Sequence, residues 1–84
     1  MDYPKAIRVL MAKAGIDTQA ELAERSGLHY NTVSTVMNGP GDRVVHVMGF
    51  ARGLGVEASE LMREAESYPD PVKAVEMAAS EQAG

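Results

Sequence analysis

Apolar residues recur at intervals of three and four along most of this 84-residue chain, with polar and charged residues between them. This spacing places the apolar side chains on one side of a helix, whereas a half-buried strand needs strict alternation. No clean alternating run bounded by turns occurs in the sequence. The pattern therefore predicts an all-α fold of five helices with no strands.

Turn and capping residues set the limits of the first two predicted helices. The first covers residues 3–14 and stops at Gly15, which favours a helix end. The second starts from Thr18 as N-cap, with Glu21 three residues later completing a capping box. It ends at Gly27.

The third helix is predicted over residues 29–37. It ends where Gly39 takes the left-handed conformation and Pro40 prevents continuation. The fourth starts from Asp42 as N-cap and is closed by Gly55. Its apolar side is formed by Val44, Val47, Phe50, Ala51 and Leu54.

Two glycines, Gly49 and Gly53, lie inside the fourth helix. Each weakens it by about 1 kcal/mol relative to Ala, so tertiary packing has to hold this helix in place. The fifth helix covers residues 57–67 and closes a compact domain, residues 1–67. The acidic tail, residues 68–84, is predicted to be either a short sixth helix or a frayed end.

Residues 19–36 (QAELAERSGLHYNTVSTV) have the layout of a helix-turn-helix. Ala23 is small enough for two helices to cross closely, and Gly27 tolerates the positive φ of a tight turn. The apolar seam of the second helix, which faces the core, consists of Leu28, Val33 and Val36. In such units the second helix enters the major groove of DNA.

The stretch TQAELAERSGLHYNTVSTVMNG, followed by ARGLGV and EASELM, resembles the lambda-repressor-like (XRE-type) helix-turn-helix domains of phage repressors and small bacterial regulators. The resemblance covers about residues 5–66 and leaves the tail out. It implies a five-helix bundle that binds double-stranded operator DNA as a dimer and represses transcription. Two-fold symmetry then implies an inverted-repeat operator with half-sites about 10 bp apart.

The resemblance also implies which residues contact DNA. Base-reading positions of the family are matched by Tyr30, Asn31 and Thr35, with Ser34 and His29 at their margins. An asparagine such as Asn31 can pair with adenine through two hydrogen bonds, and the methyl group of Thr35 can meet a thymine methyl. The expected phosphate contacts are Thr18 and Gln19 at the start of the second helix, and Asn38 and Arg43 after the third.

Two departures from the family pattern affect the expected specificity. Residues 29–37 contain neither Arg nor Lys, so the commonest guanine contact is missing, and the operator is A·T-rich or the specificity low. His29 stands where the family usually has Ser or Thr as N-cap. A weaker cap costs about 1 kcal/mol, unless His29 is kept to meet a phosphate.

Charge leaves a second function class open. The net charge is −4, but residues 1–56 carry six basic and five acidic residues, whereas residues 57–84 carry two and seven. The part that would dock on DNA is therefore close to neutral, which predicts weak non-specific affinity without forbidding binding. The alternative is a protein-interaction adapter or antitoxin-like partner that uses the same fold with little DNA contact.

Composition argues against several other classes. The absence of cysteine excludes disulfides and zinc–cysteine sites, and the distant His29 and His46 suggest no metal site. No nucleophile, carboxylate pair or phosphate loop suggests an enzyme, a cofactor or a small-molecule ligand. No apolar run approaches the roughly 18 residues that span a bilayer, and the N-terminal residues lack a signal-peptide pattern. We expect a cytoplasmic protein of a bacterial cell or phage-infected host.

The remaining expectations concern surface residues and assembly. Arg8 and Lys13 are expected on solvated helix faces, and Arg43 is as compatible with a surface ion pair as with a DNA contact. Met11 and Met62 are expected in the core, and Met48 and Met77 on the surface. A homodimer is expected to form through the fifth helix, the region around Met48 or the tail.

Overall fold

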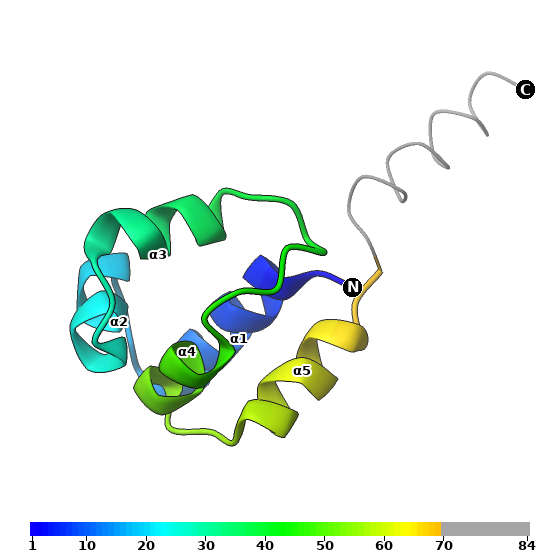
Figure 1. The fold of residues 1–84 in the computed structure, drawn as a ribbon. Helices are drawn as coiled ribbons and strands as arrows, with labels where there is room; N and C mark the ends of the chain where they lie inside the picture. The colour runs from blue at the N-terminus through cyan, green and yellow to red at the C-terminus, as the bar shows by residue number, and fades with distance from the viewer. Residues whose placement is uncertain (70–84) are drawn as a thin grey trace, which may run out of the picture.

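The computed structural model describes residues 1–69, and over this range the chain forms five α-helices and no strand (Figure 1). The helices are α1 (Tyr3–Ala14), α2 (Gln19–Ser26), α3 (Tyr30–Met37), α4 (Val47–Leu54) and α5 (Ala58–Glu66). The predicted all-α class with five helices is confirmed. The expectations for the tail beyond Pro69, including an exposed Met77, lie outside the described residues, so the domain limit at residue 67 stays a prediction.

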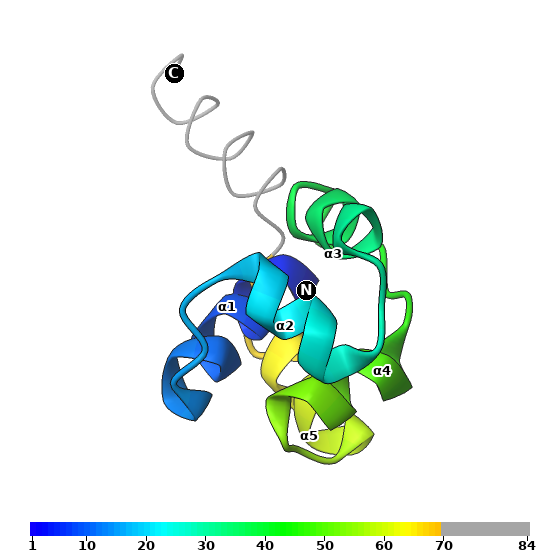
Figure 2. The same cartoon turned by 90° about the vertical axis from the view of Figure 1, so that its left-hand side faces the viewer.

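One core joins all five helices. Each helix contributes at least one fully buried large side chain, and these are Tyr3, Ile7, Leu22, Val33, Phe50 and Leu61. The rings of Tyr3 and Phe50 meet edge to face, with centroids 6.0 Å apart. Because α1 packs against α3, α4 and α5, it ties the bundle together, whereas α3 lies at its edge (Figures 1 and 2).

The methionines follow the expected division only in part. Met11 is buried, as predicted, and Met48 is the most exposed large apolar side chain in the described part of the chain. Met62, predicted in the core, is only half-buried and is not part of it. Met37, to which the sequence analysis gave no place, is 3% exposed and belongs to the core.

Both ends of α2 have the predicted capping residues. Thr18 Oγ1 accepts a hydrogen bond from the backbone N–H of Glu21 at 3.1 Å, which is the expected N-cap. The carboxylate of Glu21 accepts from Arg25 at 2.9 Å. The bond to Thr18 Oγ1 is therefore the half of the predicted capping box that forms. Gly27 ends α2 with φ of 70°, the left-handed conformation that the turn requires.

The predicted start of α4 at Asp42 is wrong, because the helix begins at Val47. Val44 and Val45 lie half-buried in an irregular segment packed against the core. The Tyr3 hydroxyl donates a hydrogen bond to the Val45 carbonyl at 2.8 Å, which takes that carbonyl out of any helical ladder. Burial raises the pKa of Tyr3 to about 12, so the hydroxyl keeps its proton and remains a donor.

The closest contact between α2 and α4 is made by Ser26 and Gly53. A Cβ atom placed on Gly53 would lie 2.9 Å from the backbone nitrogen of Ser26 and closer still to its Oγ. Ser26 is 3% exposed, and no described residue forms a hydrogen bond with its Oγ. Gly53 therefore allows the two helices to approach, a role that the sequence analysis gave to Ala23, which is also buried.

Within residues 1–69, no helix has the length and apolar character needed to cross a membrane.

Replacing Gly53 with alanine should destabilise the domain by roughly 1–3 kcal/mol, because the added methyl group overpacks the contact between α2 and α4. Gly49→Ala in the same helix is the matched control. Its Cβ would meet Leu28 at 3.4 Å, an ordinary contact, so the gain in helix propensity should leave stability unchanged or raise it by up to about 1 kcal/mol. Urea unfolding measures both, and equal midpoints for the two variants would contradict this packing.

Candidate nucleic-acid interface

One side of α3 is buried and the other is free. Val33, Val36 and Met37 are at most 4% exposed, so the predicted seam is confirmed at its two valines, while Leu28 is half-buried. Tyr30, in the first turn of the helix, is 50% exposed, and Asn31 and Thr35 lie on the side opposite the seam. The other predicted base-contacting residues divide into exposed His29, Asn31 and Thr35 and half-buried Ser34. The structure thus places four of the five predicted residues on α3 and the fifth, His29, at its N-cap.

The first turn of α3 is capped by a histidine side chain. His29 lies at the N-cap with an extended backbone, and its Nδ1 accepts a hydrogen bond from the backbone N–H of Asn31 at 3.1 Å. The cap that the sequence analysis expected to be weak is therefore formed. It satisfies one of the amide groups that a helix leaves without an internal partner.

The last turn of α3 is held from two directions. The side-chain amide of Asn38 donates to the Ser34 carbonyl at 2.9 Å, and Arg8 of α1 donates to the Met37 carbonyl at 2.9 Å. Arg8 is exposed, as expected, but it is more than a solvated side chain, because a cation here complements the negative end of the helix. The predicted left-handed Gly39 is wrong, since α3 ends at Asn38 with φ of −102°.

The hydroxyl group of Thr35 is already engaged. Thr35 Oγ1 donates to the carbonyl of Asn31, one turn earlier, at 2.8 Å. Its hydrogen is thus used within the helix. The methyl group and the two lone pairs of the hydroxyl oxygen are what Thr35 can offer to a ligand.

A shallow hollow of about 330 Å³ runs between α3 and the segment before α4. Asn31 and Thr35 line it from the helix, and Arg43 and His46 line it from the segment. His46 is the one non-glycine residue with a positive φ, 54°, in the described part of the chain. This left-handed turn lets the extended segment enter α4 while Arg43 stays beside α3. The sequence analysis did not predict this role of His46, because it placed the residue inside a helix that starts from Asp42. The helix in fact begins at Val47, so His46 lies in the turn before it.

The other two predicted phosphate contacts lie at the start of α2. Thr18 is exposed, with its hydroxyl oxygen engaged in the cap. Gln19 is half-buried and lines a second hollow, of about 370 Å³, which it shares with Arg8, Asp17 and Met37. The hollow lies where α1, the start of α2 and the end of α3 meet. The carboxylate of Asp17 would repel a phosphate at that point.

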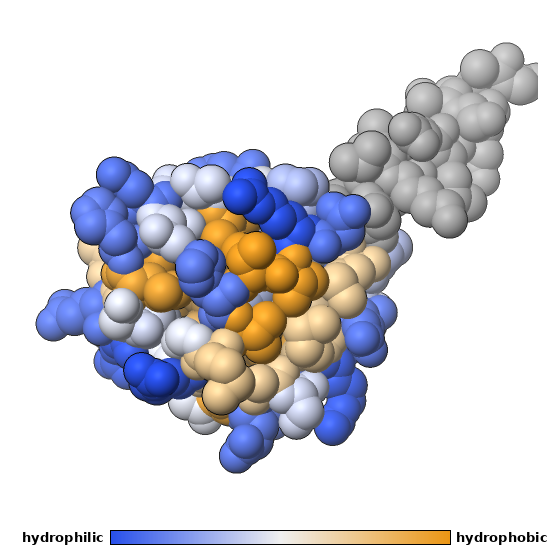
Figure 3. Space-filling view, in the orientation of Figure 1, coloured by the Kyte–Doolittle hydropathy of each residue, from blue (hydrophilic) through white to orange (hydrophobic). Residues whose placement is uncertain are grey.

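An exposed apolar area covers the segment before α4 and the start of that helix (Figure 3). We call it the Met48 patch. Met48 is 70% exposed, and three half-buried neighbours, Val44, Val45 and Val47, complete the patch. Because Val45 also lines the hollow beside α3, the patch begins next to the predicted DNA-facing surface.

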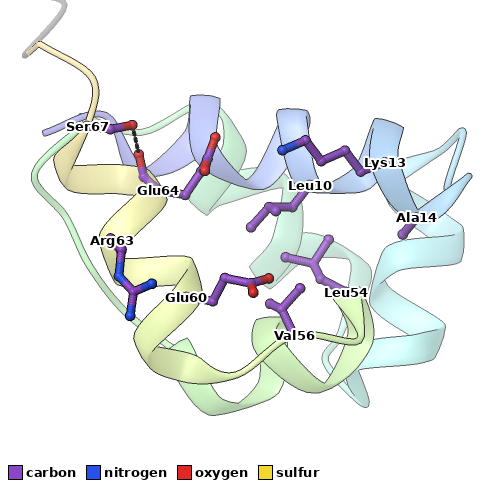
Figure 4. A pocket seen from close by; sticks show the side chains of 9 residues that line it. All are labelled: Leu10, Lys13, Ala14, Leu54, Val56, Glu60, Arg63, Glu64 and Ser67. Atoms are coloured by element: carbon purple, nitrogen blue, oxygen red, sulfur yellow. Dashed lines mark hydrogen bonds between the residues drawn. The ribbon is translucent and has the colours of Figure 1, made fainter.

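A separate groove of about 600 Å³ lies between α1 and α5 (Figure 4). Leu10, Leu54 and Val56 give it apolar walls. Its charged lining residues are Lys13, Glu60, Arg63 and Glu64. The groove shares no residue with the hollow beside α3.

A protein-family model for the Cro/C1-type HTH DNA-binding domain matches residues 6–64. The chain belongs to this family. The match runs from α1 to α5 and confirms the resemblance to XRE-type helix-turn-helix domains. Comparison with curated proteins and with solved structures found no match.

Membership of the Cro/C1-type family identifies the protein as a helix-turn-helix DNA-binding regulator, and its partner class is DNA. The family is one of regulators rather than enzymes. Among residues 1–69, no three His, Cys, Asp or Glu side chains come together as a metal site would require.

Replacing Arg8 with methionine should lower stability by about 1 kcal/mol, because the Met37 carbonyl loses a charged donor while the apolar stem of the side chain is kept. Lys13→Met, on the exposed surface of the same helix, should change stability by less than about 0.5 kcal/mol. Thermal unfolding of the two variants makes the comparison. Equal shifts would show that the bond from Arg8 contributes nothing to the last turn of α3.

Proposed function

We propose that this protein is a sequence-specific transcriptional repressor of a bacterial cell or phage-infected host, which acts in the cytoplasm and binds an inverted-repeat operator as a dimer. The observation that supports it best is the outward side of α3. Tyr30, Asn31 and Thr35 are exposed on a helix whose opposite side is buried and whose two ends are held by hydrogen bonds. Such a helix fits the major groove without rearrangement.

Each outward residue has a role that its hydrogen bonds permit. The side chain of Asn31 pairs with adenine through N6 and N7. Thr35 presents its methyl group to a thymine methyl, because its hydroxyl hydrogen is used by the Asn31 carbonyl. The half-exposed ring of Tyr30 packs on a thymine methyl or donates to a phosphate.

Phosphate contacts come from both sides of α3. Arg43 is exposed and shares the hollow with Asn31 and Thr35, so it reaches the backbone of the strand that α3 reads. Asn38 is exposed after the last turn of α3, and its amide would exchange the longer of its two bonds to Ser34, 3.4 Å to Oγ, for a phosphate oxygen. Thr18 and Gln19 stand at the start of α2, where backbone N–H groups attract a phosphate.

Dimerisation through the Met48 patch supplies the affinity that a single weakly charged domain lacks. Because this apolar surface lies beside the hollow, a dimer formed through it would have its two-fold axis close to α3. Two α3 helices can then face the same side of one duplex and enter successive major grooves. The rival interface on α5 lies around the groove between α1 and α5, which is separate from α3.

The groove between α1 and α5 favours a second candidate, a protein-interaction adapter or antitoxin-like partner. Its apolar walls and mixed charges suit a partner protein, and the outward side of α3 carries no Arg or Lys for phosphates. An adapter of this kind would keep the fold and make little use of DNA.

The repressor proposal is tested by selecting bound sequences from a random duplex pool and titrating the best sequence at two salt concentrations. We expect an A·T-containing palindrome, together with an affinity that falls as salt rises because phosphate contacts release counterions. An unenriched pool, or binding that does not respond to salt, favours the adapter.

Asn31→Ala should weaken binding to the selected palindrome by about 1–3 kcal/mol and relax the preference at one base position in each half-site. Gln19→Ala is the matched comparison, because loss of a backbone contact weakens binding to every sequence alike. Fluorescence titration of parent and single-base variant duplexes separates the two patterns. Unaltered base preference in Asn31→Ala would remove Asn31 from the base-reading set.

Met48→Asp should convert the dimer to a folded monomer and reduce operator affinity at least tenfold, because a charge replaces the most exposed apolar side chain of the patch. Ser59→Asp, on the exposed surface of α5, places the same charge near the rival interface. Sedimentation equilibrium reports the assembly of both variants. A dimer that survives the first change and is lost with the second places the interface on α5.

A further inference from the structure

The hydrogen bond that caps α3 fixes where the imidazole of His29 carries its hydrogen. Nδ1 accepts from the backbone N–H of Asn31 at 3.1 Å. A neutral imidazole has one N–H and one acceptor nitrogen, so the accepting Nδ1 is bare and the hydrogen lies on Nε2. His29 is exposed, and Nε2 occupies the far edge of the ring from the cap bond. The cap thus leaves a donor at the tip of α3.

We propose that His29 is a specificity-determining residue of α3, in which Nδ1 holds the helix start while Nε2–H donates to an acceptor atom of the bound duplex. The inference rests on the proposed function and names the chemistry of one contact. The acceptor is guanine N7 or a phosphate oxygen, both of which accept a hydrogen bond.

The other outward groups of α3 show what this donor adds. The helix has no Arg or Lys, and the hydroxyl hydrogen of Thr35 is used by the Asn31 carbonyl. The remaining side-chain donors of the exposed set are the Asn31 amide and the Tyr30 hydroxyl, so His29 adds a third, at the end of α3 that base-reading helices direct into the groove.

Capping alone does not account for an imidazole at this position. Ser, Thr, Asn and Asp are the preferred N-caps, and each supplies the acceptor with a shorter side chain. The imidazole supplies the same acceptor and carries a second polar atom one ring farther from the backbone. Exchanging His29 for serine therefore keeps the cap and removes the outward donor, which separates the two roles.

The ring hydrogen is tested first on the free protein. Long-range ¹H–¹⁵N spectra of the histidine rings distinguish the two neutral tautomers. We expect the Nε2–H form for His29, and the Nδ1–H form would overturn the proposal. Because no DNA is present, this result does not depend on the repressor function.

The contact is tested with His29→Ser on the selected duplex. We expect an unfolding midpoint equal to or above that of the parent and an affinity lower by about fivefold or more. His29→Ala, which lacks both the cap and the donor, should lose stability as well as affinity. Parent-like affinity in His29→Ser would limit His29 to capping and overturn the proposal.

Modified duplexes identify the acceptor. If the acceptor is guanine N7, then 7-deazaguanine weakens the parent and leaves His29→Ser unaffected. If it is a phosphate oxygen, methylphosphonate substitution at that phosphate weakens binding by the parent and leaves His29→Ser unaffected. Equal losses of affinity in the two proteins at every modified position argue against the contact. A parent that binds no duplex overturns the repressor function itself, which distinguishes that failure from one confined to His29→Ser.

Discussion

The length of α3 is the constraint on which the DNA-facing surface depends. An eight-residue helix is not stable in water by itself, so α3 exists only as part of the bundle. Burial of Val33, Val36 and Met37 supplies the apolar contribution. Hydrogen bonds from Asn31 N–H to His29 at one end, and from Arg8 at the other, satisfy groups that the helix leaves open. The outward residues are therefore held in place by contacts that point inward.

The first helix controls this surface although no residue of α1 belongs to the predicted base-reading set. Arg8 bonds the last turn of α3, and the Tyr3 hydroxyl bonds the carbonyl of Val45 in the following segment. That segment carries Arg43 and His46 along the hollow beside Asn31 and Thr35. Two side chains of one helix thus fix both walls of the hollow, so changes in α1 should reach the interface without touching DNA.

The helix-turn-helix could be predicted because its capping and turn residues act locally. The start of α4 and the role of Gly53 could not, because they depend on contacts between residues far apart in the sequence. Thr18 and Gly27 act within a few residues, so the sequence alone located the turn and the apolar seam. The start of α4 depended on Tyr3, which is 42 residues from the carbonyl it bonds, and the spacing of Val44 and Val47 suits a helix as well as a buried loop. The sequence analysis counted Gly53 only as a residue that weakens its helix. Its packing role could not be predicted, because its partner Ser26 lies on another helix.

An uncharged reading surface changes how specificity is reached. Non-specific affinity for DNA comes from cations placed near phosphates, and α3 supplies none, while the residues beyond Val56 add a strong acidic excess. We expect such a domain to bind random duplex weakly at physiological salt, so that little of it is lost to competing sites. In the proposed dimer, discrimination would depend on the few donors and methyl groups of α3 acting twice, once in each half-site. The proposal therefore couples assembly to base reading: without a second copy, the contacts that distinguish one sequence from another would be too few to retain the protein on DNA.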